Sequence, residues 1–397
     1  MQACDRAGIM VWHDFMFACA MYPGDAPFLA LVTQEIKQQI PRLAAHPSLV
    51  YFNGNNEVDV AWHNWGFQGQ YNLHEKDQQE IELAYQNLFQ KTLPLYVNSL
   101  TDQSIPYVHT SPLSNWGKDD FFNHGTMHYW GVWHGKDPLH DFANKIGRFN
   151  AEYGFQSFPE YNTLLTFSDT TQWDLSSDVM KHHQKSYVGN DMILKHAKRL
   201  YGKPETFEDF VYYSQLTQAK AVSMAVAGHR IDFPRCGGTL YWQVNDCWPA
   251  PTWSSIDYNW NWKALQYEVK KDYEDVAVVA KYDDLENRSY YIVNDLPDKY
   301  TSTIQVQLID LKGRTVKEWS EEVCFVGSGS KMIGFDEGVI AEMTKSNLLV
   351  KFTWNNAKGG SFTRDFANIK NDYKKAKIED ITLTIDAIDE TAKTAVI

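Results

Sequence analysis

Short apolar runs alternate with helical patterns over the first 264 residues of the chain. Compact apolar runs bounded by turn residues are typical of buried strands, whereas apolar residues that recur with a helical period predict helices. Repeated alternation of strand and helix predicts a parallel sheet, open or closed. The expected strands are 9–12, 49–53, 107–109, 127–130, 148–151 and 238–243. The expected helices are 27–45 (interrupted near Pro41), 75–100, 191–200 and 206–229.

The longer connections follow the strands, and the polar and aromatic clusters lie in these connections. A (β/α)8 barrel keeps its site in such loops, so an α/β barrel of the TIM type is the expected fold. Six strands can be identified where a closed barrel has eight. The chain opens with an uncapped helical tail, Met1–Gly8, that runs into the first strand. We therefore expect the barrel to lack its first two strands, which would lie upstream of Met1.

The pattern changes near residue 273, where short strands separated by turn residues begin. Of the 14 tryptophans, 12 precede residue 265, which supports a boundary at this point. The short strands predict an all-β, immunoglobulin-like sandwich. They are expected at 276–281, 289–293, 303–309, 315–321, 348–354 and 360–366. The expected domains are a barrel over 1–272, a sandwich over 273–373, and a linker with the start of a further β-domain over 374–397, including a strand at 378–385.

Composition excludes several classes of function. Hydrophobic residues make up 44% of the chain, as in globular proteins, and the formal net charge of −13 argues against a nucleic-acid ligand. No apolar run approaches the length of a membrane-spanning helix. Five scattered cysteines without a CxxC pair argue against a disulfide framework or a zinc cluster. No GxSxG, phosphate-loop or GxGxxG motif occurs, and the histidines at 128–134 have no carboxylate at ligand spacing, so we expect no cofactor and no metal.

Two glutamates are the strongest candidates for chemistry. Glu57 ends the segment Val50–Glu57 and Glu152 lies within Arg148–Phe155, and each follows a run with strand character. A pair of carboxylates at the ends of two strands is what a retaining glycosidase requires, one as acid and then base, the other as nucleophile. Spacing alone leaves other interpretations open. Asn56 and Glu57 could cap the next helix, Glu152 could be a surface loop residue, and Trp242 could pack in a core instead of forming the floor of a sugar site.

Four segments carry a resemblance to a known family. Val11–Pro23, Gly54–Glu57, Glu152–Ser157 and Trp242–Pro249 resemble, in order and spacing, the β-mannosidases of glycoside hydrolase family 2. The resemblance covers residues 1 to about 264. It implies a catalytic (β/α)8 barrel between β-sandwich domains and removal of non-reducing-end β-D-mannose with retention of configuration, without a cofactor. Because such relatives carry several hundred further residues upstream, we expect a fragment with both glutamates and an incomplete mannose site.

The matching motifs also imply roles for single residues. Glu57 resembles the acid/base and Glu152 the nucleophile, while Asn56 resembles the partner of the sugar 2-hydroxyl. Trp242 looks like a sugar-stacking residue, and Trp65 like an aromatic wall near the leaving group. The residue at 134 stands close to where relatives carry a tyrosine that supports the nucleophile. The full expected substrate-binding set is Asn56, Trp65, Trp133, His134, Trp242, Asp14 and Asp246.

Competing functions are kept open at this level. One is another family 2 exo-glycosidase, a β-glucuronidase or β-galactosidase, although the segment Asp14–Pro23 favours the mannosidase branch. The other is a non-catalytic carbohydrate-binding or inactive fragment. The expected partner is a carbohydrate, whether a β-mannoside, a manno-oligosaccharide or a glycan, with neither nucleic acid nor membrane. The sequence leaves the oligomeric state open. It also leaves the compartment open, with periplasmic, secreted and lysosomal locations possible.

Overall fold

Five parallel strands and the helices between them form the part of the chain that carries both glutamates. The computed structural model describes residues 1–117, 122–283, 287–345, 347–355, 360–368, 387–389 and 394–396. Its residues group into two compact units, the first made of 1–155 and 224–244, the second of 156–223 and 245–397. The three expected domains divide the chain differently, and their boundaries stay a prediction.

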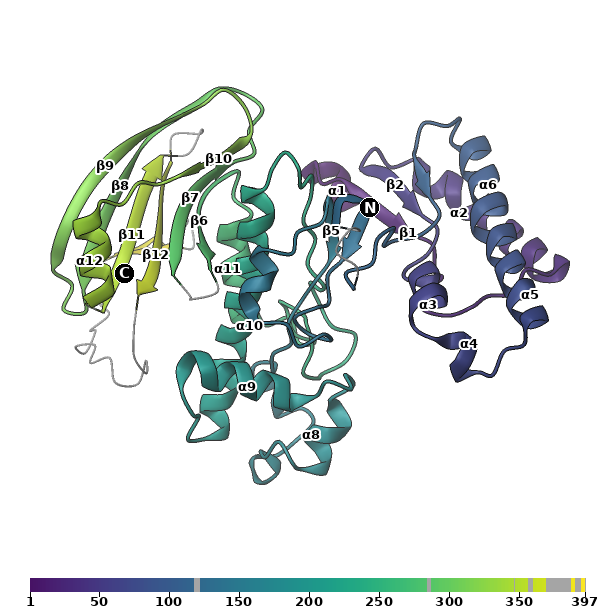
Figure 1. Cartoon of the computed structure of the whole chain (residues 1–397), viewed down its shortest axis with the longest axis horizontal. Coiled ribbons are helices and arrows are strands. Elements are labelled where there is room, and N and C mark those ends of the chain that lie inside the picture. The colour runs from purple at the N-terminus through teal and green to yellow at the C-terminus, as the bar shows by residue number, and fades with distance from the viewer. Residues whose placement is uncertain are drawn as a thin grey trace. The chain divides into compact units, whose positions relative to one another are not determined.

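The first unit contains two parallel sheets, of order β1-β2-β3 and β4-β5 (Figure 1). The expected strand 238–243 is reduced to a single parallel bridge between Asn150 and Thr239. The other five expected strands are present, each with shifted bounds or a shorter span except β2. The strands are β1 (Val11–Asp14), β2 (Leu49–Asn53), β3 (Tyr107–Val108), β4 (Thr126–His128) and β5 (Phe149–Glu152).

A ring contact and a hydrogen bond join the two sheets. The rings of Trp12 on β1 and Phe149 on β5 contact each other, with centroids 5.8 Å apart. Next to β3, the N–H of Leu113 donates to the carbonyl of Thr126 at 3.1 Å, which joins the loop after β3 to β4. Neighbouring strands of a barrel contact each other in this way, but the strands of the described residues do not form a closed barrel. The structure is thus a mixed α/β fold, and the closed barrel stays a prediction.

Helices lie between the strands of the first unit (Figure 1). Asp25 caps α2 by accepting a hydrogen bond from the N–H of Phe28 at 3.1 Å. The expected interruption of this helix near Pro41 is wrong, because the helix continues through Pro41 and the N–H of Ala45 still reaches the Pro41 carbonyl at 3.2 Å. These helices are α1 (Gln2–Ala7), α2 (Ala26–Ala44), α3 (Val58–Asn64), α4 (Phe67–Gln70), α5 (Glu75–Tyr85), α6 (Leu93–Leu100) and η3 (Leu139–Ala143).

The expected helix 75–100 is present but contains a π-helical segment. This segment, η1 (Gln86–Thr92), separates α5 from α6, and the three form one column in Figure 1. Pro94, two residues after its end, has no N–H to bond the carbonyl of Gln90, so the regular α-helical ladder cannot run unbroken here. The apolar face of α2 packs against this column with the sheet to form a core.

The second unit combines helices with two antiparallel sheets. The sheets have the orders β10-β7-β6 and β12-β11-β8-β9. Helix α10 crosses from the second unit into the first at residue 224. The helices are α7 (Tyr161–Leu164), η4 (Thr170–Gln172), α8 (Asp178–His183), α9 (Asn190–Tyr201), α10 (Phe207–Ile231), α11 (Ala264–Asp272) and α12 (Glu337–Lys345). The strands are β6 (Val276–Tyr282), β7 (Arg288–Asn294), β8 (Tyr300–Asp310), β9 (Thr315–Phe325), β10 (Gly329–Met332), β11 (Leu348–Asn355) and β12 (Ser361–Asn368).

Side chains from the two antiparallel sheets share one core, as in a β-sandwich. Tyr290 of β7, for example, lies 5.0 Å from Phe352 of β11, measured between ring centroids. All six expected sandwich strands are present, and β10 and α12 are additional. The expected strand 378–385 lies outside the described residues. Beyond β12, the structure describes the antiparallel pair β13 (Ala387–Asp389) and β14 (Thr394–Val396).

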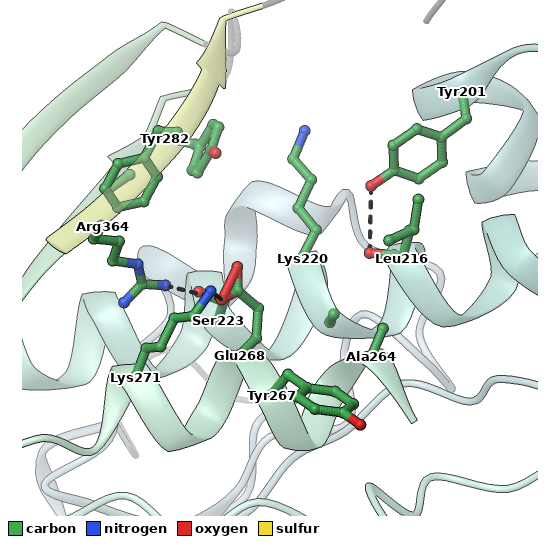
Figure 2. A pocket seen from close by; sticks show the side chains of 13 residues that line it. Tyr201, Leu216, Lys220, Ser223, Ala264, Tyr267, Glu268, Lys271, Tyr282 and Arg364 are labelled. Atoms are coloured by element: carbon green, nitrogen blue, oxygen red, sulfur yellow. Dashed lines mark hydrogen bonds and ion pairs between the residues drawn. The ribbon is translucent and has the colours of Figure 1, made fainter. Parts of the chain in front are cut away.

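A cavity of about 340 Å³ lies in the second unit, lined by residues of α9, α10, α11, β6 and β12 (Figure 2). Arg364 of β12 borders it and is 3% exposed, yet it faces two carboxylates of α11. Its guanidinium lies 2.6 Å from the fully buried carboxylate of Asp272 and 3.5 Å from that of Glu268. A buried ion pair therefore joins helix α11 to the four-stranded sheet.

Candidate active site

Two glutamates and one histidine meet at the carboxyl ends of parallel strands in the first unit. Glu57 follows β2, His128 ends β4 and Glu152 ends β5. The Nδ1 atom of His128 lies 2.9 Å from Oε1 of Glu57 and 3.5 Å from Oε2 of Glu152. One oxygen of each carboxylate and one imidazole nitrogen all lie within 4.8 Å of one another. The topology thus brings the two expected glutamates together.

The spacing of the two carboxylates distinguishes between types of glycosidase. Retaining enzymes hold their carboxyl groups roughly 5–5.5 Å apart, whereas inverting enzymes need about 6.5–9.5 Å to admit a water molecule. One oxygen of Glu57 and one of Glu152 lie within 4.8 Å of each other, so the two carboxylates approach each other closely. The side chains are 13% and 14% exposed, so both are partly open to solvent.

Glu57 has a strained backbone that is fixed from several sides. Its φ of 61° lies in the left-handed region, which costs a residue with a side chain roughly 1–3 kcal/mol. Its N–H donates to the carbonyl of Ser111 at 2.8 Å, and the N–H of Asn56 donates to that of Phe17 at 2.9 Å. Strain of this kind persists only where the surroundings over-determine the conformation, which is characteristic of functional residues.

Asn55, which the sequence did not single out, organises the start of α3. Its buried Oδ1 accepts hydrogen bonds from the N–H of Val58 at 3.0 Å and from the hydroxyl of Thr110 at 2.7 Å. The Glu57 side chain makes no capping bond. The alternative that Glu57 serves as a helix cap therefore does not hold. Next to it, a side chain at Gly54 would place Cβ 2.3 Å from the Tyr107 hydroxyl, so only glycine fits this close approach.

His128 is the central residue that sequence reasoning missed. It is 3% exposed, and its Nε2 lies 2.9 Å from the Ser111 hydroxyl, which fixes the orientation of the ring. Burial opposes a charge on the imidazole, but the carboxylates of Glu152 and Glu57 outweigh burial and raise the pKa of His128. In the described part of the chain these three residues also have donor atoms that could ligate a cation, although the bond between His128 and Glu57 uses two of them.

Glu152 has a carboxyl group whose pKa is raised. Burial raises the pKa of its carboxyl to about 7, with nearby Glu57 adding to the effect and His128 opposing it. The indole Nε1 of Trp130 donates to Oε2 of Glu152 at 3.3 Å. His134, expected near this position, instead packs its ring against Trp130, with centroids 5.4 Å apart. The hydrogen bond to the expected nucleophile thus comes from Trp130.

The raised pKa of Glu152 predicts how stability changes with pH. The folded protein binds this proton more tightly than the unfolded chain, whose pKa is near 4.5, so stability falls as pH rises from about 4.5 to about 7. Glu152→Gln removes the charge, and we expect it to raise the free energy of unfolding above pH 7 by about 1–3 kcal/mol. Urea titrations at several pH values measure this, with the exposed Glu80→Gln as control. Identical pH profiles for Glu152→Gln and the parent protein would contradict it.

Comparisons with known proteins identify relatives of the chain. No protein-family model matches the chain. A β-mannosidase of Capra hircus is 31% identical over 337 residues, which are 77% of this chain and 36% of the goat protein. β-Mannosidase B of Aspergillus terreus is 30% identical over 388 residues, or 90% of this chain and 45% of that protein. This chain is a homologue of the β-mannosidases. The β-mannosidase homologue therefore spans less than half the length of these curated relatives.

Solved structures give the same result for the fold of the β-mannosidase homologue. The β-D-mannosidase of Dictyoglomus thermophilum matches 92% of this chain with 44% of its own, at a TM-score of 0.75 and 29% identity. The exo-chitosanase of Amycolatopsis orientalis matches with a TM-score of 0.67 at 16% identity, which indicates the fold alone. No helix of the described residues has the length and apolar character needed to cross a bilayer.

The other expected substrate-binding residues of the β-mannosidase homologue differ in their surroundings. Asn56 lies beside Glu57, and Asp14 ends β1, where it accepts a hydrogen bond from the Trp12 indole at 2.6 Å. Trp65 and Trp242 are 45% and 43% exposed, so both indoles offer surface to a ligand.

The last two expected residues of the β-mannosidase homologue, Trp133 and Asp246, contact other side chains of the protein. Trp133 is fully buried and packs edge-on against Phe155, so its side chain offers no surface to a sugar in this structure. Asp246 belongs to the second unit, where the hydroxyl of Ser254 donates to its carboxylate at 2.7 Å.

Proposed function

We propose that this chain carries the catalytic pair of a retaining exo-β-mannosidase that releases non-reducing-end β-D-mannose. The close spacing of Glu57 and Glu152 is the observation that carries the proposal, because it supports double displacement. The relation to β-mannosidases supports mannose as the sugar. Because the chain corresponds to less than half of these relatives, residues from other parts of a longer protein could complete the site.

In the first step, the ionised Glu152 attacks the anomeric carbon while protonated Glu57 donates its proton to the glycosidic oxygen. The bond to the leaving group breaks and an ester forms between mannose and Glu152. Because burial disfavours the charge on Glu152, a positive His128 at 3.5 Å is the group that favours ionisation of the nucleophile. The Trp130 indole adds a hydrogen bond to the same carboxylate.

In the second step, Glu57 acts as base. It takes a proton from water, which attacks the anomeric carbon from the side of the departed leaving group, and mannose is released with its original configuration. Loss of the Glu152 charge in the ester removes a negative charge beside Glu57, which favours the ionised Glu57 that acts as base.

Recognition of the sugar would come from residues around the pair. We assign Asn56 to the 2-hydroxyl, since it directly precedes the acid on the same loop. The exposed indole of Trp242 would stack on the sugar ring, and that of Trp65 would flank the leaving group. Asp14, at the end of β1, would accept hydrogen bonds from other hydroxyls of the same sugar.

A substrate panel tests the function. We expect the protein to hydrolyse p-nitrophenyl β-D-mannoside at least about tenfold faster than the β-galactoside or β-glucuronide, because binding that favours one sugar by ~1.4 kcal/mol gives this ratio. Proton NMR of the first product should show the β-anomer of mannose. Faster cleavage of another glycoside would assign the chain to a different exo-glycosidase. Mannoside binding without turnover would indicate a carbohydrate-binding fragment.

A further inference from the structure

One oxygen of the expected acid contacts a cysteine. The Sγ of Cys19 lies 3.6 Å from Oε2 of Glu57, within the range of a hydrogen bond from a thiol. The other oxygen, Oε1, bonds His128 at 2.9 Å. The carboxyl group of Glu57 is therefore held on both sides, by an imidazole on one oxygen and by a thiol on the other.

The backbone fixes Cys19 at this position. Its N–H donates to the carbonyl of Asn56 at 2.9 Å, so the loop after β1 is tied to the residue before Glu57. Cys19 has a φ of 52°, in the left-handed region that residues with side chains seldom adopt. The amide of Asn56 also lies 3.8 Å from the sulfur. Two adjacent strained residues, Cys19 and Glu57, thus face each other through their side chains.

The thiol remains protonated at neutral pH. Partial burial of the sulfur, together with the carboxylate of Glu57, raises the pKa of Cys19 to about 12. A thiol can donate weakly through S–H and accept weakly through sulfur. It can therefore contact Glu57 both when the glutamate is ionised and when it is protonated.

We propose that Cys19 is a positioning residue, which holds Oε2 of Glu57 as the oxygen that carries the proton to the leaving group. His128 engages Oε1, so Oε2 is the oxygen left for this proton. With Glu57 protonated, the sulfur accepts from the carboxyl O–H until the substrate oxygen replaces it, and with Glu57 ionised the thiol donates. This assignment deepens the proposed function and rests on it.

Leaving-group dependence tests the role. A dinitrophenyl leaving group departs without a proton, whereas the sugar leaving group of β-1,4-mannobiose requires one, so a fault in acid positioning affects mannobiose alone. We expect Cys19→Ala to lower kcat/KM for mannobiose about tenfold, a part of the 10²–10⁴-fold that general acid catalysis contributes, and to change the dinitrophenyl mannoside by less than about twofold. Cys19→Ser, whose hydroxyl also donates and accepts, should recover most of the mannobiose rate.

The matched control is Cys324→Ala, which removes an exposed thiol from β9 and should change kcat/KM for neither substrate. Equal losses on both substrates would reduce Cys19 to a structural residue, and unchanged rates on both would remove it from the mechanism.

A second measurement needs no turnover. Since burial and, after it, the Glu57 carboxylate raise the pKa of the thiol, Glu57→Gln should remove the second cause and speed alkylation of Cys19 by iodoacetamide several-fold at pH 9, while Cys324 reacts at its former rate. Peptide mass spectrometry reports both rates. If no mannoside is cleaved, the proposed function fails, but the alkylation rates still decide whether the two side chains interact. An unchanged Cys19 rate in folded Glu57→Gln would overturn the contact.

Discussion

Glu152→Ala is expected to lower kcat on p-nitrophenyl β-D-mannoside by at least about 10³-fold, equivalent to a loss of more than ~4 kcal/mol of transition-state stabilisation. Without this carboxylate the covalent intermediate cannot form. Glu57 and His128 remain in place, but the nucleophile beside them is missing. The fold should be intact, because the side chain lies beside an accessible site and does not form part of an apolar core. Stopped assays of mannoside cleavage measure kcat, and circular dichroism of the same samples shows whether the fold is intact.

Azide distinguishes the two carboxylates. In Glu152→Ala a small anion can occupy the vacated space and attack from the nucleophile's side, which yields α-mannosyl azide. In Glu57→Ala azide can replace the missing base and attack the ester from the opposite side, which yields the β-anomer. The exposed Glu80→Ala is the matched control and should retain full activity. Activity within tenfold of the parent protein in Glu152→Ala, or azides of the reversed configurations, would contradict the assigned roles.

Arg364→Met is expected to lower the free energy of unfolding by about 3–5 kcal/mol, because it leaves the fully buried carboxylate of Asp272 without its partner. The pair at 2.6 Å joins α11 to β12, so the loss should appear as weaker protection of both elements in hydrogen exchange. Chemical denaturation measures the change in free energy.

The double variant Arg364→Met/Asp272→Leu removes both charges and should recover much of this loss, since buried ion pairs are often replaceable by apolar groups. Arg314 supplies the matched control. It pairs with Asp310 at the same short range, 2.7 Å, but is 74% exposed. Arg314→Met should therefore cost less than about 1 kcal/mol. A similar cost for both arginine substitutions would show that burial of the ion pair is not what matters.

The sequence predicted those features that local pattern determines. Periodicity located five parallel strands of the first unit and six strands of the sandwich, and the residues at the ends of β2 and β5 were the expected glutamates. Asn56, adjacent to the acid, follows from its place in the chain. These features depend on near neighbours, so a local pattern contains the information that specifies them.

Features that depend on distant residues were missed. His128 contacts Glu57 across 71 residues and Cys19 contacts it across 38, and neither pairing has a signature in either local segment. The many aromatic residues around Trp133 are compatible with a sugar site and with core packing alike. In the structure Trp133 is buried against Phe155. A histidine within the predicted parallel strand 127–130 was the available signal for His128, since the carboxyl ends of such strands share one edge of a sheet.

The bridge between Asn150 and Thr239 has a consequence for the order in which the site is formed. Tyr153, the residue after Glu152, bonds the Thr239 hydroxyl at 2.6 Å across 86 residues of sequence. During synthesis, β4 and β5 can emerge and pair long before that partner exists, so the strand that carries the nucleophile acquires its second neighbour last. Closing so long a loop is slow compared with local pairing. A nascent chain ending before residue 239 would thus hold the acid and His128 but lack the contacts that support Glu152.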